Sequence, residues 1–215
     1  MDCKAHWDHV YQTVAPDRVS WFQPQPTLSL ELIRRVAPRS TAAILDVGGG
    51  ASTLVGHLLE NGYRSVTVLD LSSTALSAAR QRLGERGAIF TWLEADVLGV
   101  ALAPSAYDVW HDRAVFHFLT DPEDRRRYAA QVHHAVRPDG YVIVAAFGPD
   151  GPTVCSGLPV VRYAPAALHA ELGEGFHLVE STREQHRTPA GRSQEFIYCL
   201  FRFARRAERQ LQHGV

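Results

Sequence analysis

Three consecutive glycines follow an acidic residue in the stretch Asp46-Val47-Gly48-Gly49-Gly50. The aliphatic residues 42–45 before the glycines predict a strand, and the apolar positions 54, 55, 58 and 59 after them are spaced as on one face of a helix. A glycine turn between a strand and a helix lets a ligand approach the main chain closely, and the free N–H groups of the helix point at the ligand. We therefore take this turn as the candidate cofactor site.

Two further acids are expected at the carboxyl ends of neighbouring strands. Residues 65–70 form a buried type of strand that ends in Asp70, 20 residues beyond Gly50. A carboxylate at this distance is placed to accept hydrogen bonds from the hydroxyls of a ribose. The alternative is a helix cap or a surface acid, although the hydroxyls at positions 72–74 already offer caps. A third strand, expected over residues 88–97, brings Asp96 to the same edge.

The acid beside the glycines separates the possible classes of ligand. A negative charge at Asp46 would repel a pyrophosphate, and Thr53 stands where a dinucleotide-binding turn usually has its third glycine. The position suits instead a phosphate-free cofactor with a cationic amino group and a sulfonium, such as S-adenosylmethionine (SAM). An NAD-linked oxidoreductase and a non-catalytic SAM-binding protein are the alternatives from other functional classes.

Taken together, the motifs resemble those of the class I (seven-strand) SAM-dependent methyltransferases. The resemblance covers about residues 40–150 and rests on five segments, which are residues 46–50, 68–70, 94–97, 107–112 and 137–144. It implies that Asp70 holds the ribose hydroxyls, that Asp96 holds the adenine amino group, and that the main chain at Gly48 and Gly50 holds the methionine part of SAM. Ser52 differs from the family, which often has a further glycine there. The full set of expected cofactor contacts is Trp7, Tyr11, Trp21, Asp46, Gly48, Gly49, Gly50, Asp70, Leu71, Asp96, Val97 and His111.

Aromatic residues are dense ahead of the first strand of the sheet. Trp7 and Tyr11 are four residues apart on one side of a short expected helix, and Trp21 follows in a proline-stiffened connection. This arrangement is similar to the N-terminal cap of a branch of the family that includes citrate synthase lysine methyltransferase and many uncharacterised bacterial enzymes. We expect the cap to close over the cofactor; simple packing on the core is the alternative.

The fourth expected strand, residues 107–112, leads into the reaction zone. His111, Asp112, Arg113 and His117 are expected to converge there, because ligands of open α/β sheets bind beyond the carboxyl ends of the strands. Asp112 and His117, with Arg113, are the candidates for orienting or deprotonating a nucleophile. A structural ion pair between Asp112 and Arg113 and a packed His117 are the alternatives.

Candidate substrate contacts are Phe116 in that segment, Cys155 in a glycine- and proline-rich loop over residues 148–159, and His186 beside a hairpin turn. An inert cysteine in a covering loop is the alternative for Cys155. We expect no metal site, since the adjacent His133 and His134 face different ways.

Composition limits the class of protein. The chain has 215 residues, 46% of them apolar, and a formal net charge of -1, so we expect one domain with a single large core and no general attraction to nucleic acid or membrane surfaces. Three cysteines without metal-binding or disulfide spacing fit a reducing cytoplasm. The start of the sequence does not resemble a signal peptide. A single lysine among 22 lysine and arginine residues suggests a GC-rich bacterial gene.

These elements predict a doubly wound α/β fold. We expect a mostly parallel seven-stranded sheet that ends in an antiparallel hairpin over residues 176–187 and 193–203. The cap is expected to comprise residues 1–26, and the α/β core residues 27–203. Residues 204–215 are expected to form a charged tail. The expected activity is methyl transfer to a small molecule, at a thiol, another soft atom or an amine, with SAM as cofactor and S-adenosylhomocysteine (SAH) as product. A protein lysine is the alternative acceptor, and the chain is expected to be a monomer or a homodimer.

Overall fold

The computed structural model describes residues 3–204, so most of the expected tail lies outside the described residues. The main sheet has seven strands in the order β3-β2-β1-β4-β5-β9-β8, and only β9 runs against the others. The strands are β1 (Ile44–Val47), β2 (Val66–Asp70), β3 (Thr91–Glu94), β4 (Tyr107–Arg113), β5 (Val136–Phe147), β8 (Phe176–Arg187) and β9 (Ser193–Phe203). The predicted fold class and closing hairpin are confirmed.

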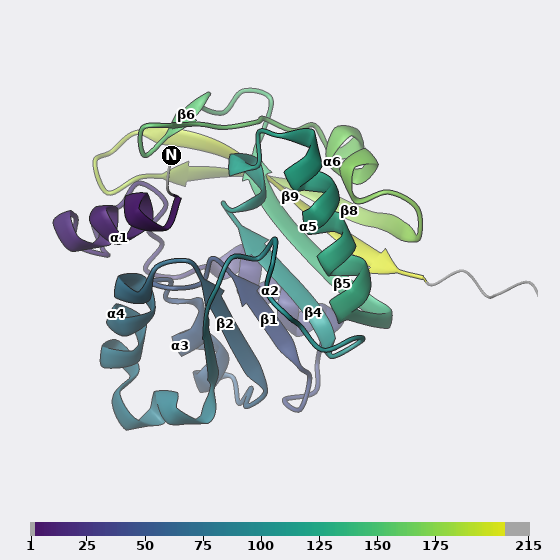
Figure 1. Ribbon diagram of the computed structural model, residues 1–215, viewed down its shortest axis with the longest axis horizontal. Helices are drawn as coiled ribbons and strands as arrows, with labels where there is room; N and C mark the ends of the chain where they lie inside the picture. Colours follow the sequence, from purple (N-terminus) through teal and green to yellow (C-terminus); the bar gives the residue numbers. More distant parts are fainter. Residues whose placement is uncertain (1–2, 205–215) are drawn as a thin grey trace, which may run out of the picture.

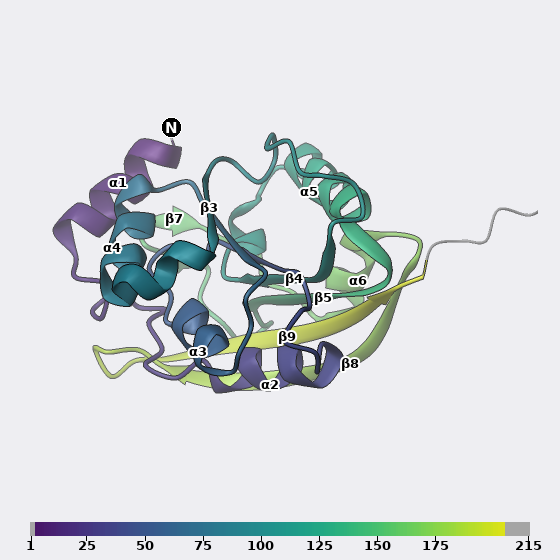
Figure 2. The same cartoon turned by 90° about the horizontal axis from the view of Figure 1, so that it is seen from below.

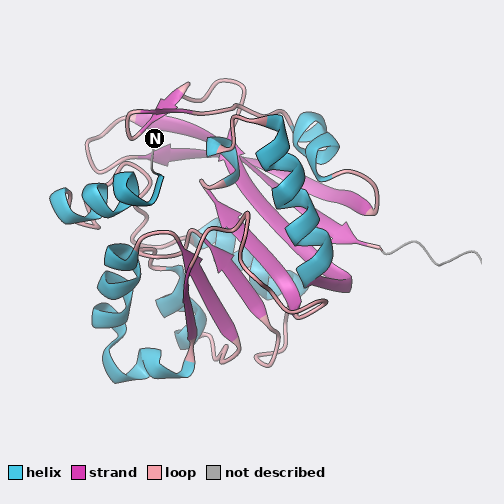
Figure 3. Cartoon of the chain, viewed as in Figure 1, coloured by secondary structure: helices cyan, strands magenta, loops and turns pink. Residues whose placement is uncertain are grey.

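Helices cover both faces of this sheet (Figures 2 and 3). One face packs against α2, α3 and α4 through a core that includes Leu32, Leu58 and Leu76, and the other packs against α5 and α6 through Tyr128 and Leu168. The helices are α2 (Thr27–Val36), α3 (Leu54–Glu60), α4 (Ser73–Leu83), α5 (Pro122–Ala135) and α6 (Pro165–Leu172). Because both faces are covered, β1 is buried along its whole length, as its aliphatic sequence predicts. Within residues 3–204, no helix combines the length and the apolarity needed to cross a membrane.

The helix starts follow from local capping chemistry. The Ser72 hydroxyl accepts a hydrogen bond from the Ala75 N–H at the start of α4 (3.1 Å). At α5 the Asp121 carboxylate accepts from the Glu123 N–H (2.8 Å), and Pro122 takes the first helical position. These two caps place both helices with their N-termini near the carboxyl edge of the sheet, where the acids of β1 and β2 also end.

The cap forms an additional layer at this edge. Helix α1 (Cys3–Thr13) lies over the carboxyl ends of the strands, next to the N-terminal end of α4 (Figure 1). Its Trp7 makes edge-to-face contacts with Trp21 and Phe118, with ring centroids 5.7 and 5.0 Å apart. No residue of α1 is fully buried, so the helix is held at the edge of the core rather than inside it.

Two segments differ from the prediction. The third strand is limited to residues 91–94, because Gly84–Ile89 continues α4 as a 3₁₀ helix, η1, instead of entering the sheet. The loop over residues 148–159 contains a short hairpin of β6 (Val154–Cys155) and β7 (Leu158–Pro159), in which Ser156 and Gly157 make the turn with positive φ. The short 3₁₀ helix η2 (Phe116–Phe118) follows β4.

Candidate cofactor and acceptor site

A cavity of about 440 Å³ lies at the carboxyl ends of the parallel strands, with α1 forming part of its wall. It brings together eight of the twelve expected cofactor contacts, which are Trp7, Tyr11, Trp21, Gly48, Asp70, Leu71, Asp96 and Val97. An adjoining chamber of about 40 Å³ shares Tyr11, Trp21, Gly48 and Arg113 with it and adds Asp46, Gly49 and His111. Gly50 lines neither space and acts through its main chain.

The glycine turn has no room for side chains. Gly48 has a φ of +67°, and a Cβ on it would lie 2.1 Å from a methyl carbon of Val115. A Cβ on Gly49 would lie 2.3 Å from Asp46 Oδ2, and one on Gly50 would lie 2.6 Å from Asp70 Oδ2. The turn therefore brings main chain and two carboxylates into one small volume, which only glycine permits.

Asp70 is fixed by main-chain donors. Its Oδ2 accepts a hydrogen bond from the Gly50 N–H (3.0 Å) and its Oδ1 accepts one from the Ser72 N–H (2.8 Å). Burial raises the pKa of Asp70 to about 6, and the two N–H donors oppose that rise. The carboxylate is thus held at the cavity wall with acceptor capacity left for a ligand.

The Asp46 carboxylate is also held in place, by a hydrogen bond to His111 of β4. Asp46 Oδ1 lies 2.7 Å from His111 Nδ1, and His111 Nε2 lies 2.9 Å from the Ser29 hydroxyl. Asp46 Oδ2 is buried and has no hydrogen-bond partner among the described residues. A buried carboxylate oxygen without a donor is costly, so this atom fits a ligand that brings a cationic N–H group.

Arg113 spans both spaces and ties the cap to the sheet. Its Nε donates to the Tyr198 hydroxyl (2.7 Å), its NH1 donates to the Trp21 carbonyl oxygen (2.9 Å), and its NH2 lies 3.4 Å from Glu184. The guanidinium also lies 4.4 Å from the ring centroid of Phe196. With its donors used in this way, Arg113 is a structural link as well as a charge at the cavity wall.

The expected convergence of four polar side chains is wrong for Asp112. Adjacent residues of a strand point to opposite faces, so Asp112 faces α5, while His111 faces Ser29 of α2 and Arg113 faces Trp21 of the cap. Its carboxylate accepts from the Tyr128 hydroxyl (2.7 Å) and the Val115 N–H (2.9 Å), and burial raises its pKa to about 6. It neither pairs with Arg113 nor lines the two spaces.

His117 and Phe116 are core residues. His117 is fully buried, its Nδ1 accepts a hydrogen bond from the Phe147 N–H (3.3 Å), and burial lowers its pKa to about 3. Phe116 is equally buried and packs edge-to-face on Tyr128. Phe116 therefore does not line the cavity as a substrate contact, and His117 matches the alternative of a packed histidine.

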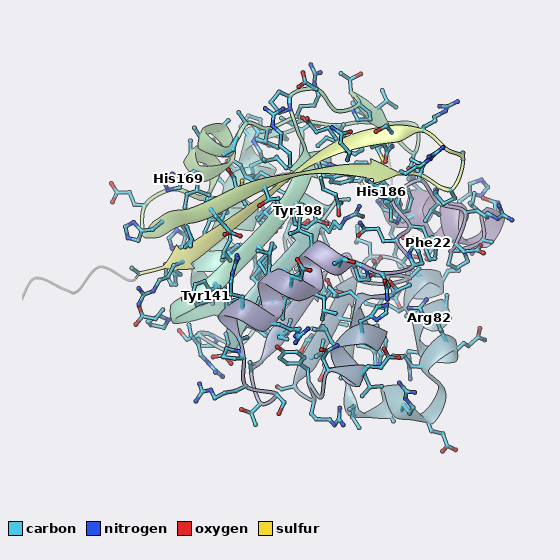
Figure 4. The ribbon with its side chains drawn as sticks, turned by 180° about the vertical axis from the view of Figure 1, so that it is seen from behind. Phe22, Arg82, Tyr141, His169, His186 and Tyr198 are labelled. Carbon is cyan, nitrogen blue, oxygen red and sulfur yellow. The ribbon has the colours of Figure 1, made fainter. Side chains whose placement is uncertain are left out.

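The other two predicted substrate contacts lie behind the cavity wall. The Cys155 thiol is buried 4.0 Å from the Ser20 hydroxyl, and burial raises its pKa to about 11. His186 Nε2 lies 2.7 Å from the Ser20 carbonyl oxygen, and burial lowers the pKa of that imidazole. Figure 4 shows His186 at the end of the hairpin that faces Phe22 and the cap. Both residues support the cap segment rather than the cavity itself.

Two polar contacts of the site have no clear signal in the sequence. Asp8 of α1 accepts from the Ser72 hydroxyl (2.7 Å) and pairs with Lys4 (2.7 Å), which lowers the pKa of Asp8 to about 2. Arg82 of α4 donates to the carbonyl oxygens of Ala51 (3.1 Å) and Ser52 behind the glycine turn (Figure 4). Neither contact follows a sequence spacing rule, because each joins elements far apart in the chain.

The fold and this edge define a doubly wound α/β protein with a cavity whose carboxylates fit a phosphate-free, cationic ligand. Residues 44–140 match the family model described as a methyltransferase domain. EEF1A lysine methyltransferase 2 of Danio rerio is 29% identical over 111 residues, covering 49% of this chain and 48% of that protein. A ubiquinone/menaquinone biosynthesis C-methyltransferase of Roseobacter denitrificans is 30% identical over 116 residues, covering 52% and 45%. The chain thus spans about half the length of these relatives.

A solved structure shares the fold over most of the chain. The 1,6-didemethyltoxoflavin-N1-methyltransferase of Burkholderia thailandensis, solved with its substrate and SAH, has a TM-score of 0.74 at 22% identity and covers 94% of this chain and 87% of its own. The chain therefore shares the fold of this methyltransferase, and residues 44–140 are similar to a methyltransferase domain. The unpartnered oxygen of Asp46, the glycines without room for a Cβ and the oriented Asp70 fit a phosphate-free cationic ligand such as SAM.

Proposed function

We propose that the protein transfers the methyl group of SAM to a nucleophilic atom of a small molecule held under the aromatic cap. The observation that carries the proposal is the apolar wall on the cap side of the cavity, formed by Trp7, Trp21, Phe118, Leu158 and Pro159. Three of these residues are aromatic and in mutual edge contact through Trp7. Such a wall suits an acceptor with an apolar or aromatic body that is enclosed during the reaction.

Different residues of the cavity would bind different parts of the cofactor. Asp70 would accept from the ribose hydroxyls, Asp96 would meet the adenine amino group, and Asp46 would meet the ammonium group. When bound, SAM supplies a methyl group on a positively charged sulfur that leaves as a neutral thioether. The protein then contributes alignment and exclusion of water, which are together worth about 7–11 kcal/mol in well-oriented reactions. Aromatic rings in the wall favour a nearby positive charge.

The acceptor atom reaches the site already unprotonated in this proposal. The two bases predicted from the sequence, Asp112 and His117, line neither the cavity nor the chamber. Tyr11 does line both spaces, but burial raises its pKa, so its hydroxyl stays protonated and does not act as a base at neutral pH. A thiolate, another soft atom or a neutral amine fits this wall better than an alcohol.

A protein lysine is the second candidate acceptor. It is favoured by the similarity to a lysine methyltransferase, at 29% identity over about half of the chain. An NAD-linked oxidoreductase fits less well, since the buried, unpartnered oxygen of Asp46 would face a pyrophosphate. The two methyltransferase readings differ in the size of the acceptor, and this difference can be measured.

The test uses the purified full chain, an extract of cells that lack the protein, and SAM labelled in its methyl group. Products are separated by size before the label is counted. Label in the small-molecule fraction, together with release of SAH, is the expected result. Label in a protein fraction would replace the proposal with the lysine reading. Binding of SAM without release of SAH would instead support a non-catalytic binding protein, and binding of NAD in preference to SAM would overturn the methyltransferase activity.

We also propose a setting for this activity. Cys3, Cys155 and Cys199 are unpaired, and the last two are buried, which favours a reducing cytoplasm. The bias from lysine to arginine favours a bacterial source. The near-neutral net charge favours neither nucleic acid nor a membrane surface as a partner, and the chain acts as a monomer or a homodimer.

A further inference from the structure

A connected series of polar side chains runs behind the glycine turn. Arg113 Nε donates to the Tyr198 hydroxyl (2.7 Å), and the Tyr198 hydroxyl interacts with the hydroxyl of Ser29. Ser29 then lies 2.9 Å from His111 Nε2, and His111 Nδ1 lies 2.7 Å from Asp46 Oδ1. These five side chains come from β4, β9, α2 and β1, so the chain crosses four elements to reach one carboxylate.

The two ends of this chain have fixed roles in hydrogen bonding. A guanidinium only donates and a carboxylate only accepts. Tyr198 therefore accepts from Arg113, and Asp46 accepts from His111 Nδ1. The Ser29 hydroxyl and the His111 ring complete the connection between these two ends.

Burial makes this chain important for orientation. Ser29, His111, Tyr198 and Asp46 are 0 to 3% exposed, so a missing partner is not replaced easily by solvent. A buried polar network in which all members are satisfied holds its side chains rigidly. Figure 4 shows Tyr198 beside α2, on the face of the sheet from which Ser29 also comes. At this end of the chain, Asp46 Oδ2 has no hydrogen-bond partner among the described residues.

We propose that Ser29 and Tyr198, acting through His111, are positioning residues that aim the free oxygen of Asp46 at the ammonium group of the cofactor. Arg113 anchors the far end of the chain. The inference rests on the proposed function, because it takes SAM and SAH as the ligands. It assigns roles to two residues, Ser29 and Tyr198, that neither the glycine motif nor the strand-end acids indicate.

The test compares two ligands that differ only at the amino-acid end. SAH carries the ammonium group, whereas 5′-methylthioadenosine has the same adenosine and sulfur without it. Calorimetry measures the dissociation constants of both ligands for the full chain and for the variants Ser29→Ala and Tyr198→Phe. Because a hydrogen bond to a charged group is at stake, each variant is expected to bind SAH about tenfold more weakly. Binding of 5′-methylthioadenosine is expected to stay within about twofold.

Tyr63→Phe is the matched control. It also removes a buried tyrosine hydroxyl, one that donates to the Ala37 carbonyl oxygen (2.6 Å) away from the cavity. It should lower the melting temperature while leaving both affinities unchanged. A thermal unfolding scan of each variant identifies any loss of folded protein, and the ratio of the two dissociation constants is read only from the folded fraction.

The possible results separate this inference from the proposed function. Equal weakening of both ligands, or no change for either, in both Ser29→Ala and Tyr198→Phe overturns the positioning role. Should the unaltered protein bind neither ligand, the proposed function fails, and the inference fails with it. A loss confined to SAH supports the inference, since a merely structural defect would not distinguish the two ligands.

Discussion

Asp70 links the glycine turn to the cavity in which we propose that the cofactor binds. Its two oxygens accept from Gly50 and Ser72, and the same carboxylate faces the cavity. In Asp70→Asn the amide nitrogen replaces one acceptor, so one main-chain N–H loses its partner and the ribose loses a charged acceptor. We expect SAH to bind at least tenfold more weakly by calorimetry. Asp139→Asn changes an exposed carboxylate paired with Arg202 and should leave the affinity unchanged; equal affinities in the two variants would contradict the role of Asp70.

The buried side chains of His117 and Asp112 should have opposite effects on how the free energy of unfolding changes with pH. His117 has its pKa lowered from 6.5 to about 3, so between these values the unfolded chain binds a proton that the folded chain does not, and stability falls as the pH falls. Asp112 has its pKa raised from 3.8 to about 6, so the folded chain binds the extra proton, and stability falls as the pH rises through this window. The effect is on the order of 3 kcal/mol for a shift of about two pKa units.

Urea unfolding between pH 4 and 6 checks both signs. In His117→Leu the imidazole is removed, so the free energy of unfolding should increase less steeply with pH than in the unaltered chain. In Asp112→Asn it should increase more steeply. Each variant is compared with the unaltered chain, since Asp70, whose pKa burial raises to about 6, titrates in the same range. Slopes that change in the same direction in both variants would contradict the opposite protonation of these two groups.

At this scale the sequence predicts the contacts that depend on local order and misses those that depend on the fold. Asp46 and Asp70 follow from strand ends and a glycine turn, and the structure places both at the cofactor edge. Asp112 was misplaced because one residue of difference in a strand moves a side chain to the other face. Ser29 and Tyr198 carry no motif, and only the packing of α2 and β9 brings them to His111.

Among the elements, α1 is held at the edge of the core by charge rather than by burial. Asp8 accepts from the Ser72 hydroxyl and lies 3.4 Å from the Thr74 N–H, at the N-terminus of α4. Asp8→Asn removes the charge, so α1 should detach more often and uncover the cavity. We expect faster hydrogen exchange in residues 3–13 and weaker binding of SAH by roughly threefold to tenfold, with little change in the melting temperature.

The neighbouring carboxylate of Asp17 provides the control for this prediction. Asp17 is exposed in the same cap segment, so Asp17→Asn alters the net charge equally. It should change neither the exchange of α1 nor the affinity for SAH. Unchanged exchange in Asp8→Asn would show that the aromatic contacts of Trp7 alone hold the helix in place.

The elements themselves could be predicted more fully than their ends. The closing hairpin, expected over residues 176–187 and 193–203, has these bounds in β8 and β9. The third strand was predicted too long, since residues 88–90 are apolar enough for a strand yet follow directly from the 3₁₀ turn after α4. The apolar pattern alone does not show where a chain leaves a helix and where it enters a sheet.

On the scale of the whole molecule, segments from opposite ends of the chain meet around Arg113. Trp21 and Gln23 of the cap contact Arg113 and Glu184, and Glu184 comes from the C-terminal hairpin. The Arg113–Glu184 ion pair is largely buried, with side chains 10% and 19% exposed, so loss of the carboxylate leaves a largely buried guanidinium without its counter-ion. The hairpin therefore does more than close the sheet, because it holds the segment that forms the aromatic wall.

This arrangement predicts that Glu184→Ala loosens the cap without unfolding the sheet. The segment over residues 14–26 should become more sensitive to limited proteolysis, and SAH should protect it less than in the unaltered chain, because Gln23 loses its acceptor and Arg113 loses its ion pair. Glu180→Ala is the control, since Glu180 lies on the same strand and pairs with Arg35 on the surface. If both variants are cleaved at the same rate as the unaltered chain, the cap is held by aromatic packing alone, and the link between hairpin and cavity does not exist.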